Sequence, residues 1–416
     1  MIIQFTAGNY SSFDRPQTLN FRATGLDSPN ENVETGNVAN LGGERFLKII
    51  GVYGANASGK SNLLRAMSLF RAMVVQSMIS EDLALRNVNP FRQSQGGPDQ
   101  PSFFQIVLLL ENKRYRYGFT LQKDGNIGSE WLFGPAVRNE TYYFKRIGDQ
   151  FEINEEWFSE GYSLPMENLR NDALYLTFCS TYNGPIARSI RTFFGTKVTS
   201  EVPIRRGVRG GISIGGVYGL TNKLVEEGHE ELILSWLREA GLNYKNIILT
   251  KIDDMSKRTF LVKNVYDEAG NNIGETQMDL TADESEGTKK FYMLIGKLHR
   301  KFSEGGLFIV DEIDSNFHPS LLRKIINLFQ NPEINQANAQ LLFTSHDTTL
   351  MDPELMRRDQ FYFTEKNIFD STRLYSLADL KGIRNNADFA RQYLAGLYGA
   401  LPILSNYLEE LNEGEL

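Results

Sequence analysis

A glycine-rich segment at residues 54–61 constrains this chain more than any other part of its sequence. The segment reads GANASGKS, so Gly54, Gly59, Lys60 and Ser61 have the G-x-x-x-x-G-K-S spacing of a phosphate-binding loop. An apolar run precedes the segment and an amphipathic pattern follows it, which predicts a strand, a loop and a helix. Because glycines let successive backbone N–H groups converge on phosphate oxygens at a helix N-terminus, the segment predicts a nucleoside triphosphate site.

Each position of this loop has an expected role. The Lys60 side chain would reach the terminal phosphates, and the Ser61 hydroxyl would bind Mg²⁺. A chance glycine turn is the alternative interpretation, and the flanking strand and helix disfavour it. The expected nucleotide contacts are Gly54, Ala55, Asn56, Ala57, Ser58, Gly59, Lys60, Ser61 and Asn62.

A second apolar run, at residues 306–310, ends in two carboxylates, Asp311 and Glu312. A buried parallel strand would deliver both to the same sheet edge as the phosphate loop. There Asp311 is expected to hold Mg²⁺, directly or through water, and Glu312 to polarise the attacking water. Acidic pairs also follow apolar strands by chance, but the upstream phosphate loop favours the catalytic interpretation.

A third apolar run, at residues 340–345, ends at His346. A polar side chain at the end of this strand would point towards the γ-phosphate. The alternative is a histidine with a purely structural role. The position of His346 after the third apolar strand favours a catalytic role.

A serine and a glycine at the head of a fourth segment predict a second anion site. Ser285 and Gly287 precede residues 288–302, where apolar side chains recur at helical spacing. A serine hydroxyl and a glycine N–H at a helix start can bind an anion, although taken alone Ser285 is better explained as an ordinary N-cap. The order of phosphate loop, helix start, acidic strand and histidine strand favours the anion site, because an ABC-type ATPase head has its parts in that order.

A head of this type is expected to work as a homodimer or a higher even oligomer. The helix start of one copy would cover the γ-phosphate held by the other, so that ATP lies between two subunits. Asp314, Ser315 and Asn316 follow the acidic pair and are expected at that interface. Nucleotide binding would then close the dimer, and hydrolysis would reopen it.

Composition limits the class of protein. The chain has 416 residues and a formal net charge of −7, which predicts more than one lobe and argues against a surface coated with basic residues for nonspecific DNA binding. Its single cysteine, Cys179, excludes a disulfide framework and a multi-cysteine zinc site. Neither a membrane-spanning apolar run nor a secretion signal is recognisable, so we expect a soluble cytoplasmic protein.

The predicted fold class is α/β, an ABC-type P-loop NTPase head with a mixed β-sheet lobe, a helical lobe and a mid-chain helical/β insertion. We expect residues 1–146 to form the N-terminal half of the head, 147–243 a mainly helical insertion, and 244–416 the C-terminal half. Residues 80–101 are expected to form a surface loop. The glycine-rich loop 205–211 carries three arginines and is either a nucleic-acid contact or, more commonly for such a loop, simply solvated.

Several motifs together resemble one group, the compact prokaryotic SMC/RecF-like ABC ATPases described as AAA family ATPases, with an OLD-like head and no nuclease domain. The resemblance extends over nearly the whole chain. The motifs are YGANASGKSNLLRAM from Tyr53, ESEGTKKF from Glu284, VDEIDSNFHPSLL from Val310, QLLFTSHDTTLMD from Gln340, RRDQFYF from Arg357, LYSLADLKGIRNNADF from Leu374 and YLAGLYGALP from Tyr393.

This resemblance implies an ATPase that binds and hydrolyses ATP with Mg²⁺ and controls a separately encoded effector. In such systems the effector is a nuclease or toxin of RloB or TOPRIM type that acts in anti-phage defence, as in the PARIS system and the AbiL pair. DNA or a phage trigger protein is a further candidate partner, and no membrane partner is implied. The alternative is a RecF-like DNA-binding ATPase of DNA repair, which predicts a basic channel across the dimer face.

The resemblance also assigns residues, with two departures from the family pattern. Ser11 stands where many relatives have a basic residue, and the glutamine of the usual Q-loop has only Gln93 and Gln95 as positional candidates. The matching positions are Gly54, Asn56, Gly59, Lys60 and Ser61 in the phosphate loop, Ser285 and Gly287 in the signature, Asp311 and Glu312 as the Mg²⁺ and catalytic pair, and His346 as the switch histidine.

Overall fold

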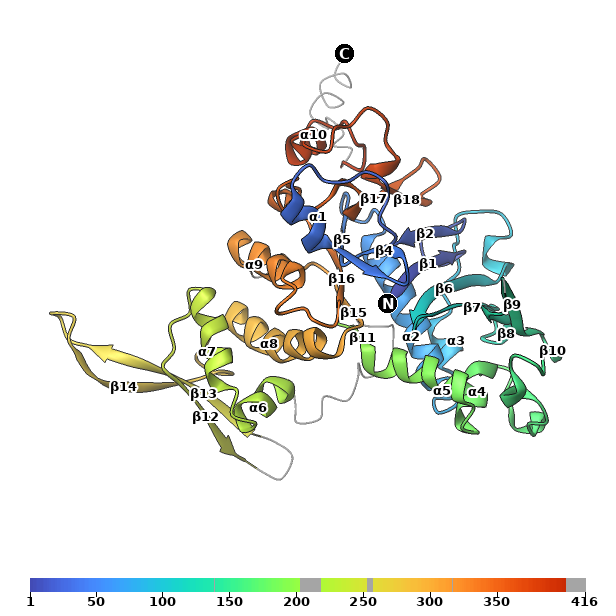
Figure 1. Ribbon diagram of the computed structural model, residues 1–416, viewed down its shortest axis with the longest axis horizontal. Coiled ribbons are helices and arrows are strands. Elements are labelled where there is room, and N and C mark those ends of the chain that lie inside the picture. Colours follow the sequence, from blue (N-terminus) through green and yellow to red (C-terminus); the bar gives the residue numbers. More distant parts are fainter. Residues whose placement is uncertain (138, 203–217, 253–256, 316, 402–416) are drawn as a thin grey trace, which may run out of the picture.

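The computed structural model describes residues 1–137, 139–202, 218–252, 257–315 and 317–401. Two predicted features therefore lie outside the described residues, namely the arginine-containing loop 205–211 and Asn316 at the expected interface. Figure 1 shows the chain as a central sheet with a second sheet on one side and a group of helices on the other. Within the described ranges, no helix is both long and apolar enough to cross a membrane.

A six-stranded sheet forms the centre of the molecule. Its neighbouring strands pair in parallel, except that the last strand is antiparallel to the one before it. Every residue of the three middle strands β15, β16 and β5 is buried, which explains why these segments read as continuous apolar runs. The strand order is β11 (Val198–Ser200), β15 (Leu307–Val310), β16 (Gln340–Thr344), β5 (Ile49–Tyr53), β17 (Phe361–Lys366) and β18 (Thr372–Ser376).

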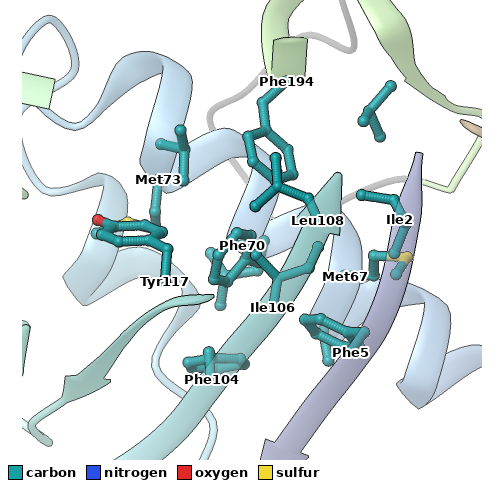
Figure 2. Close-up of a cluster of buried hydrophobic side chains, with 14 of the residues drawn as sticks. Ile2, Phe5, Met67, Phe70, Met73, Phe104, Ile106, Leu108, Tyr117 and Phe194 are labelled. Atoms are coloured by element: carbon teal, nitrogen blue, oxygen red, sulfur yellow. The ribbon is translucent and has the colours of Figure 1, made fainter. Parts of the chain in front are cut away.

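Helix α2 (Lys60–Gln76) packs in one apolar core with residues of the central sheet and of an antiparallel sheet of seven strands. Figure 2 shows Phe70 of α2 among apolar side chains of this sheet, and its ring stacks on Phe119 with the centroids 5.3 Å apart. The phosphate loop is thus followed by a helix with a firmly packed face. The strand order is β10 (Gln150–Ile153), β9 (Glu140–Ile147), β8 (Ile127–Pro135), β7 (Lys113–Leu121), β6 (Ser102–Leu110), β1 (Ile2–Gly8) and β2 (Gln17–Asn20).

A second apolar core lies on the opposite face of the central sheet. Helices α8 (Glu286–Glu304) and α9 (Pro319–Gln330) pack there, and α6 (Gly219–Glu226) and α7 (Glu230–Glu239) pack near α8. A three-stranded antiparallel sheet extends away from this helical side in Figure 1. Its strands are β12 (Asn246–Lys251), β13 (Lys257–Tyr266) and β14 (Asn272–Asp279).

Shorter elements complete the fold. They are α1 (Glu31–Asn37), the hairpin of β3 (Val38–Leu41) and β4 (Glu44–Leu47), α3 (Leu83–Asn87), α4 (Tyr175–Thr181), α5 (Pro185–Thr192), a π-helical turn (Phe193–Lys197), α10 (Phe389–Leu394), and single 3₁₀ turns at Gly97–Asp99, Ser159–Gly161, Met166–Asn168, Thr348–Leu350, Arg358–Gln360 and Leu377–Asp379. Helices α4 and α5 contact α2, and α1 contacts α9.

The α/β fold class predicted from the sequence is confirmed. The loop expected at 80–101 is corrected in part, because it contains helix α3 and its Phe91 is buried. Residues 147–243 do not pack as one body: α4 and α5 join the core around α2, whereas α7 joins the core around α8. The predicted boundaries of the three domains remain a prediction.

A buried carboxylate fastens helix α4 to the antiparallel sheet. Glu130 of β8 accepts hydrogen bonds from the Tyr117 hydroxyl at 2.8 Å and from the backbone N–H groups of Tyr175 and Leu176 at 2.6 and 2.9 Å. The Arg146 guanidinium lies 3.7 Å from Glu130, and both side chains are almost fully buried. Burial raises the pKa of Glu130, while Arg146 and the three donors oppose that rise.

Replacement of Glu130 by Ala should strongly destabilise the fold, because it leaves the Arg146 charge and two helix N–H groups buried without their acceptor. We expect the free energy of unfolding to fall by about 3–5 kcal/mol. Urea denaturation followed by circular dichroism measures this change. The control is Glu304→Ala, which removes an exposed ion pair to Arg300 of 3.1 Å and should change stability by less than about 0.5 kcal/mol. Equal effects of the two substitutions would contradict the assignment.

Candidate nucleotide site

The segment between β5 and α2 has the backbone of a phosphate-binding loop. Gly54 and Gly59 have φ angles of +147° and +114°, which residues with side chains rarely adopt. A Cβ atom on Gly54 would lie 2.4 Å from the carbonyl oxygen of Thr364, and one on Gly59 would lie 2.4 Å from the Thr372 hydroxyl. The two glycines are therefore required by close packing behind the loop as well as by its conformation.

Hydroxyl groups from three distant segments support the loop from behind. Ser58 Oγ lies 2.6 Å from the hydroxyl of Thr364 on β17. The Thr372 hydroxyl on β18 lies 2.8 Å from the carbonyl oxygen of Ser58 and 2.7 Å from Ser12 Oγ, which also accepts a 2.9 Å hydrogen bond from Asn62. Sequence analysis missed Ser12, Thr364 and Thr372, because single hydroxyl residues up to 360 positions apart form no recognisable motif.

The Lys60 side chain folds back over the loop. Its ammonium group donates hydrogen bonds of 2.8 and 3.0 Å to the carbonyl oxygens of Gly54 and Ala55. Burial lowers the pKa of Lys60, whereas the nearby carboxylates of Asp311, Glu312 and Asp314 act in the opposite direction. The lysine thus contacts the backbone of its own loop, and the acidic residues that follow β15 are near enough to oppose the lowering of its pKa.

The order β15–β16–β5 brings the ends of three parallel strands to one edge of the sheet. Asp311 follows β15, His346 follows β16 and Gly54 follows β5. Asp311 is half-buried, and Glu312 and His346 are exposed. The structure therefore places the phosphate loop, the acidic pair and the histidine at the same edge, as the sequence predicted.

The end of β16 holds the acidic turn in place. The Thr344 hydroxyl lies 2.6 Å from Asp311 Oδ1 and accepts a 2.7 Å hydrogen bond from the backbone N–H of Glu312. The His346 N–H donates to Asp314 Oδ2 at 3.2 Å, while Asp314 Oδ1 is buried with no hydrogen-bond partner in the part of the chain that the structure describes. Thr344 and Asp314 therefore belong to the site, although the sequence predicted no contact for Thr344.

The oxygen groups at this edge suit Mg²⁺. No cluster of three or more His, Cys, Asp and Glu side chains able to hold a metal occurs among the described residues. Mg²⁺ does not need such a cluster, because it usually takes one or two protein oxygens together with waters and substrate phosphates. The Ser61 hydroxyl, the Asp311 carboxylate and the Asp314 oxygen that has no partner among the described residues are donors of this hard type.

The predicted signature lies at the start of α8. Ser285 is exposed and caps the helix, with its hydroxyl accepting a 3.2 Å hydrogen bond from the backbone N–H of Thr288. Gly287 lies in the first turn and is half-buried. No hydrogen bond between described residues joins Ser285 or Gly287 to the phosphate loop of the same chain.

Two lysines connect α8 to the strand ends. Lys290 donates a 2.8 Å hydrogen bond to the carbonyl oxygen of Ser315, just beyond the acidic pair. Lys297 forms a 2.7 Å ion pair with Glu201, which follows the edge strand β11. β11 was not predicted, because three residues carry too little pattern for a strand. Its pairing with β15 brings Glu201 to the edge that holds the phosphate loop.

The structure also places Ser11 and the two Q-loop candidates, Gln93 and Gln95. The Ser11 backbone N–H donates to the Asn89 carbonyl at 2.6 Å, and the Ser11 hydroxyl accepts a 2.7 Å hydrogen bond from the Asn89 amide. Gln93 lines an open cavity of about 550 Å³, which reaches the back of the phosphate loop at Thr372. Gln95 is exposed and does not line this cavity. The assignment of a Q-loop residue remains a prediction.

Comparison with known proteins gives a family and a number of solved structures. Residues 49–163 and 239–352, more than half of the chain, match the family described as "AAA domain, putative AbiEii toxin, Type IV TA system". No curated protein matches the chain.

Three of the solved structures that match are SMC head domains. One, bound to the C-winged helix domain of ScpA, is 13% identical with a TM-score of 0.47 over 90% of this chain and 97% of that one. The head from Thermotoga maritima is 11% identical with a TM-score of 0.39, covering 90% and 98%. A head with an extended coiled coil, bound to the C-terminal domain of ScpA and derived from Pyrococcus furiosus, is 12% identical with a TM-score of 0.47, covering 95% and 99%. Identities this low say nothing about activity or partners.

The family match spans the phosphate loop in its first stretch and the helix start, the acidic pair and the histidine in its second. These are the segments that the fold brings to the carboxyl edge of the central sheet and to the start of α8. The chain therefore belongs to the AAA-domain family whose description names the AbiEii toxin and type IV toxin–antitoxin systems.

Proposed function

We propose that this chain binds ATP with Mg²⁺ at the carboxyl edge of its central sheet and hydrolyses it to ADP and phosphate. One observation carries the proposal: the Lys60 ammonium is hydrogen-bonded to two carbonyl oxygens of its own loop, at the sheet edge where Asp311 and Glu312 also follow β15. A triphosphate bound to the loop would bring phosphate oxygens to Lys60 in place of these carbonyl groups. The packing behind Gly54 and Gly59 supports the proposal, since it holds the loop in a conformation that can receive phosphate.

The residues of the edge have separate roles in this proposal. The backbone N–H groups of residues 54–62 bind the phosphates, as they do in other glycine-rich loops at helix starts. Ser61 and Asp311 hold Mg²⁺, which neutralises charge on the β- and γ-phosphates. Glu312 orients and deprotonates the attacking water, and His346 contacts the γ-phosphate. The exposure of Glu312 and His346 supports these roles, because both side chains must reach the nucleotide.

We further propose that two copies enclose the nucleotide, in a homodimer or a higher even oligomer. Ser285 is exposed at the start of α8, and no hydrogen bond within the described part of the chain joins it to the phosphate loop. A helix of 19 residues with a serine cap is suited to an anion at its N-terminus. A second copy facing the first would supply that anion as the γ-phosphate, and Ser285 and Gly287 would complete the site.

The biological role we propose is control of a separately encoded effector, a nuclease or toxin of RloB or TOPRIM type, in prokaryotic anti-phage defence. The motif resemblance and the toxin–antitoxin description of the family support this role. Closure of the dimer around ATP and its reopening after hydrolysis would hold or release the effector.

Substitution of Glu312 by Gln should slow hydrolysis while ATP still binds. The amide keeps the size of the side chain and cannot take a proton from water, so we expect kcat to fall about 10²–10⁴-fold. Phosphate release measures kcat, and a fluorescent ATP analogue measures affinity. The control is Glu333→Gln, an exposed glutamate after α9. A Glu312→Gln variant with normal turnover would show that another group orients the water.

A mixture of two inactive variants tests whether the sites are shared between subunits. Lys60→Ala removes a phosphate ligand and Ser285→Arg blocks the opposing helix start, so each variant alone should hydrolyse almost no ATP. A mixed dimer keeps one undamaged site, and random 1:1 exchange should restore about a quarter of wild-type turnover if the sites act independently. If the subunits exchange but the mixture hydrolyses ATP no faster than either variant alone, the proposal of independent sites shared between subunits is wrong.

The effector should co-purify with this chain from its native host. A Glu312→Gln variant that stays closed on ATP and a Lys60→Ala variant should retain different amounts of the effector, because the nucleotide state determines the interface. Quantitative mass spectrometry of the two purifications measures the difference. Recovery of DNA-repair proteins instead of a nuclease or toxin would contradict the defence role and favour the RecF-like alternative.

A further inference from the structure

Thr344 makes contacts that none of the roles above uses. It is the last residue of β16 and fully buried between the ends of β15 and β5. Its hydroxyl lies 2.6 Å from Asp311 Oδ1 and 2.7 Å from the backbone nitrogen of Glu312. One buried hydroxyl therefore contacts both members of the acidic pair.

The direction of these two hydrogen bonds is fixed by the groups themselves. The Glu312 N–H can only donate, so the Thr344 oxygen accepts from it. A threonine hydroxyl has one proton, and the Asp311 carboxylate is an acceptor when ionised. The hydroxyl proton therefore points to Asp311 Oδ1. This hydrogen bond engages Oδ1 and leaves Oδ2 of the same carboxylate available for a cation.

The same strand end also fixes the backbone of the acidic turn. Glu312 has a φ of +48°, in the left-handed region that residues other than glycine rarely adopt. Besides the bond to the Thr344 hydroxyl, the turn is held by a 3.0 Å hydrogen bond from the Ile313 N–H to the Thr344 carbonyl oxygen. A strained conformation persists only where its surroundings determine it, and at Glu312 these contacts do so.

We propose that Thr344 is a positioning residue for the ATPase reaction. Its hydroxyl orients the Asp311 carboxylate toward Mg²⁺ and holds Glu312 in the conformation that directs its side chain to the attacking water. This inference rests on the proposed function of the site. Groups that orient metal-binding carboxylates typically matter about 10–100-fold for metal affinity or activity, although they do not touch the substrate.

The test replaces Thr344 by Val, which keeps the shape of the side chain and removes both hydrogen bonds. We expect kcat to fall about 10–100-fold. The gain in affinity for a fluorescent ATP analogue on adding Mg²⁺, relative to EDTA, should fall about tenfold or more. Thr344→Ser restores the hydroxyl and should restore both properties.

Two comparisons separate positioning from a loss of stability. Thr177→Val removes another buried hydroxyl, which donates a 2.9 Å hydrogen bond to Val74 in α2, and should keep wild-type kcat. If Thr344→Val does not fold, Thr344→Ala and Thr344→Ser still differ only by the hydroxyl, and only the Ser variant should be active.

Wild-type turnover together with a wild-type Mg²⁺ effect in Thr344→Val would overturn the inference. A Ser variant as defective as the Ala variant would do so too, because the hydroxyl alone would then not restore activity. If the wild-type chain proves not to hydrolyse ATP, the proposed function fails at that point. The Mg²⁺-dependent affinity of the Val and Ser variants then still decides the role of Thr344.

Discussion

Parallel pairing of β15, β16 and β5 is the constraint on which the rest of the structure depends. It places Asp311, His346 and Gly54, which are separated by almost 300 residues of chain, at one edge of one sheet. Burial of every residue in these strands fixes their register, since a shift would expose apolar side chains or bury the polar ends. The chemistry at the edge is thus set by the packing of the sheet below it.

The phosphate loop is preformed by packing that nucleotide does not supply. Ser12, Thr364 and Thr372 come from the first and last parts of the head and contact the back of the loop. The acidic turn is held in a comparable way by Thr344. A rigid site of this kind loses little conformational entropy when a ligand binds, which favours tight and oriented binding.

The sequence predicted the residues whose signal is local. The glycine spacing of the phosphate loop and the apolar runs before Asp311 and His346 each lie within about ten residues, and the α/β fold follows from their order. It did not predict Ser12, Thr344, Thr364 or Thr372, whose contacts depend on strand neighbours far away in the chain. The three-residue strand β11 and helix α3 in the expected loop were missed because short elements are decided by tertiary packing.

The Ser285 cap at the start of α8 is the part of the proposed site that a second copy would complete. A crystal or cryo-EM structure of the full chain with Mg²⁺ and a non-hydrolysable ATP analogue tests the central claim most directly. The account predicts the triphosphate within residues 54–62, Mg²⁺ between Ser61 and Asp311, and Ser285 of a second copy at the γ-phosphate. A triphosphate bound elsewhere, or Ser285 distant from it in every assembly, would contradict the account.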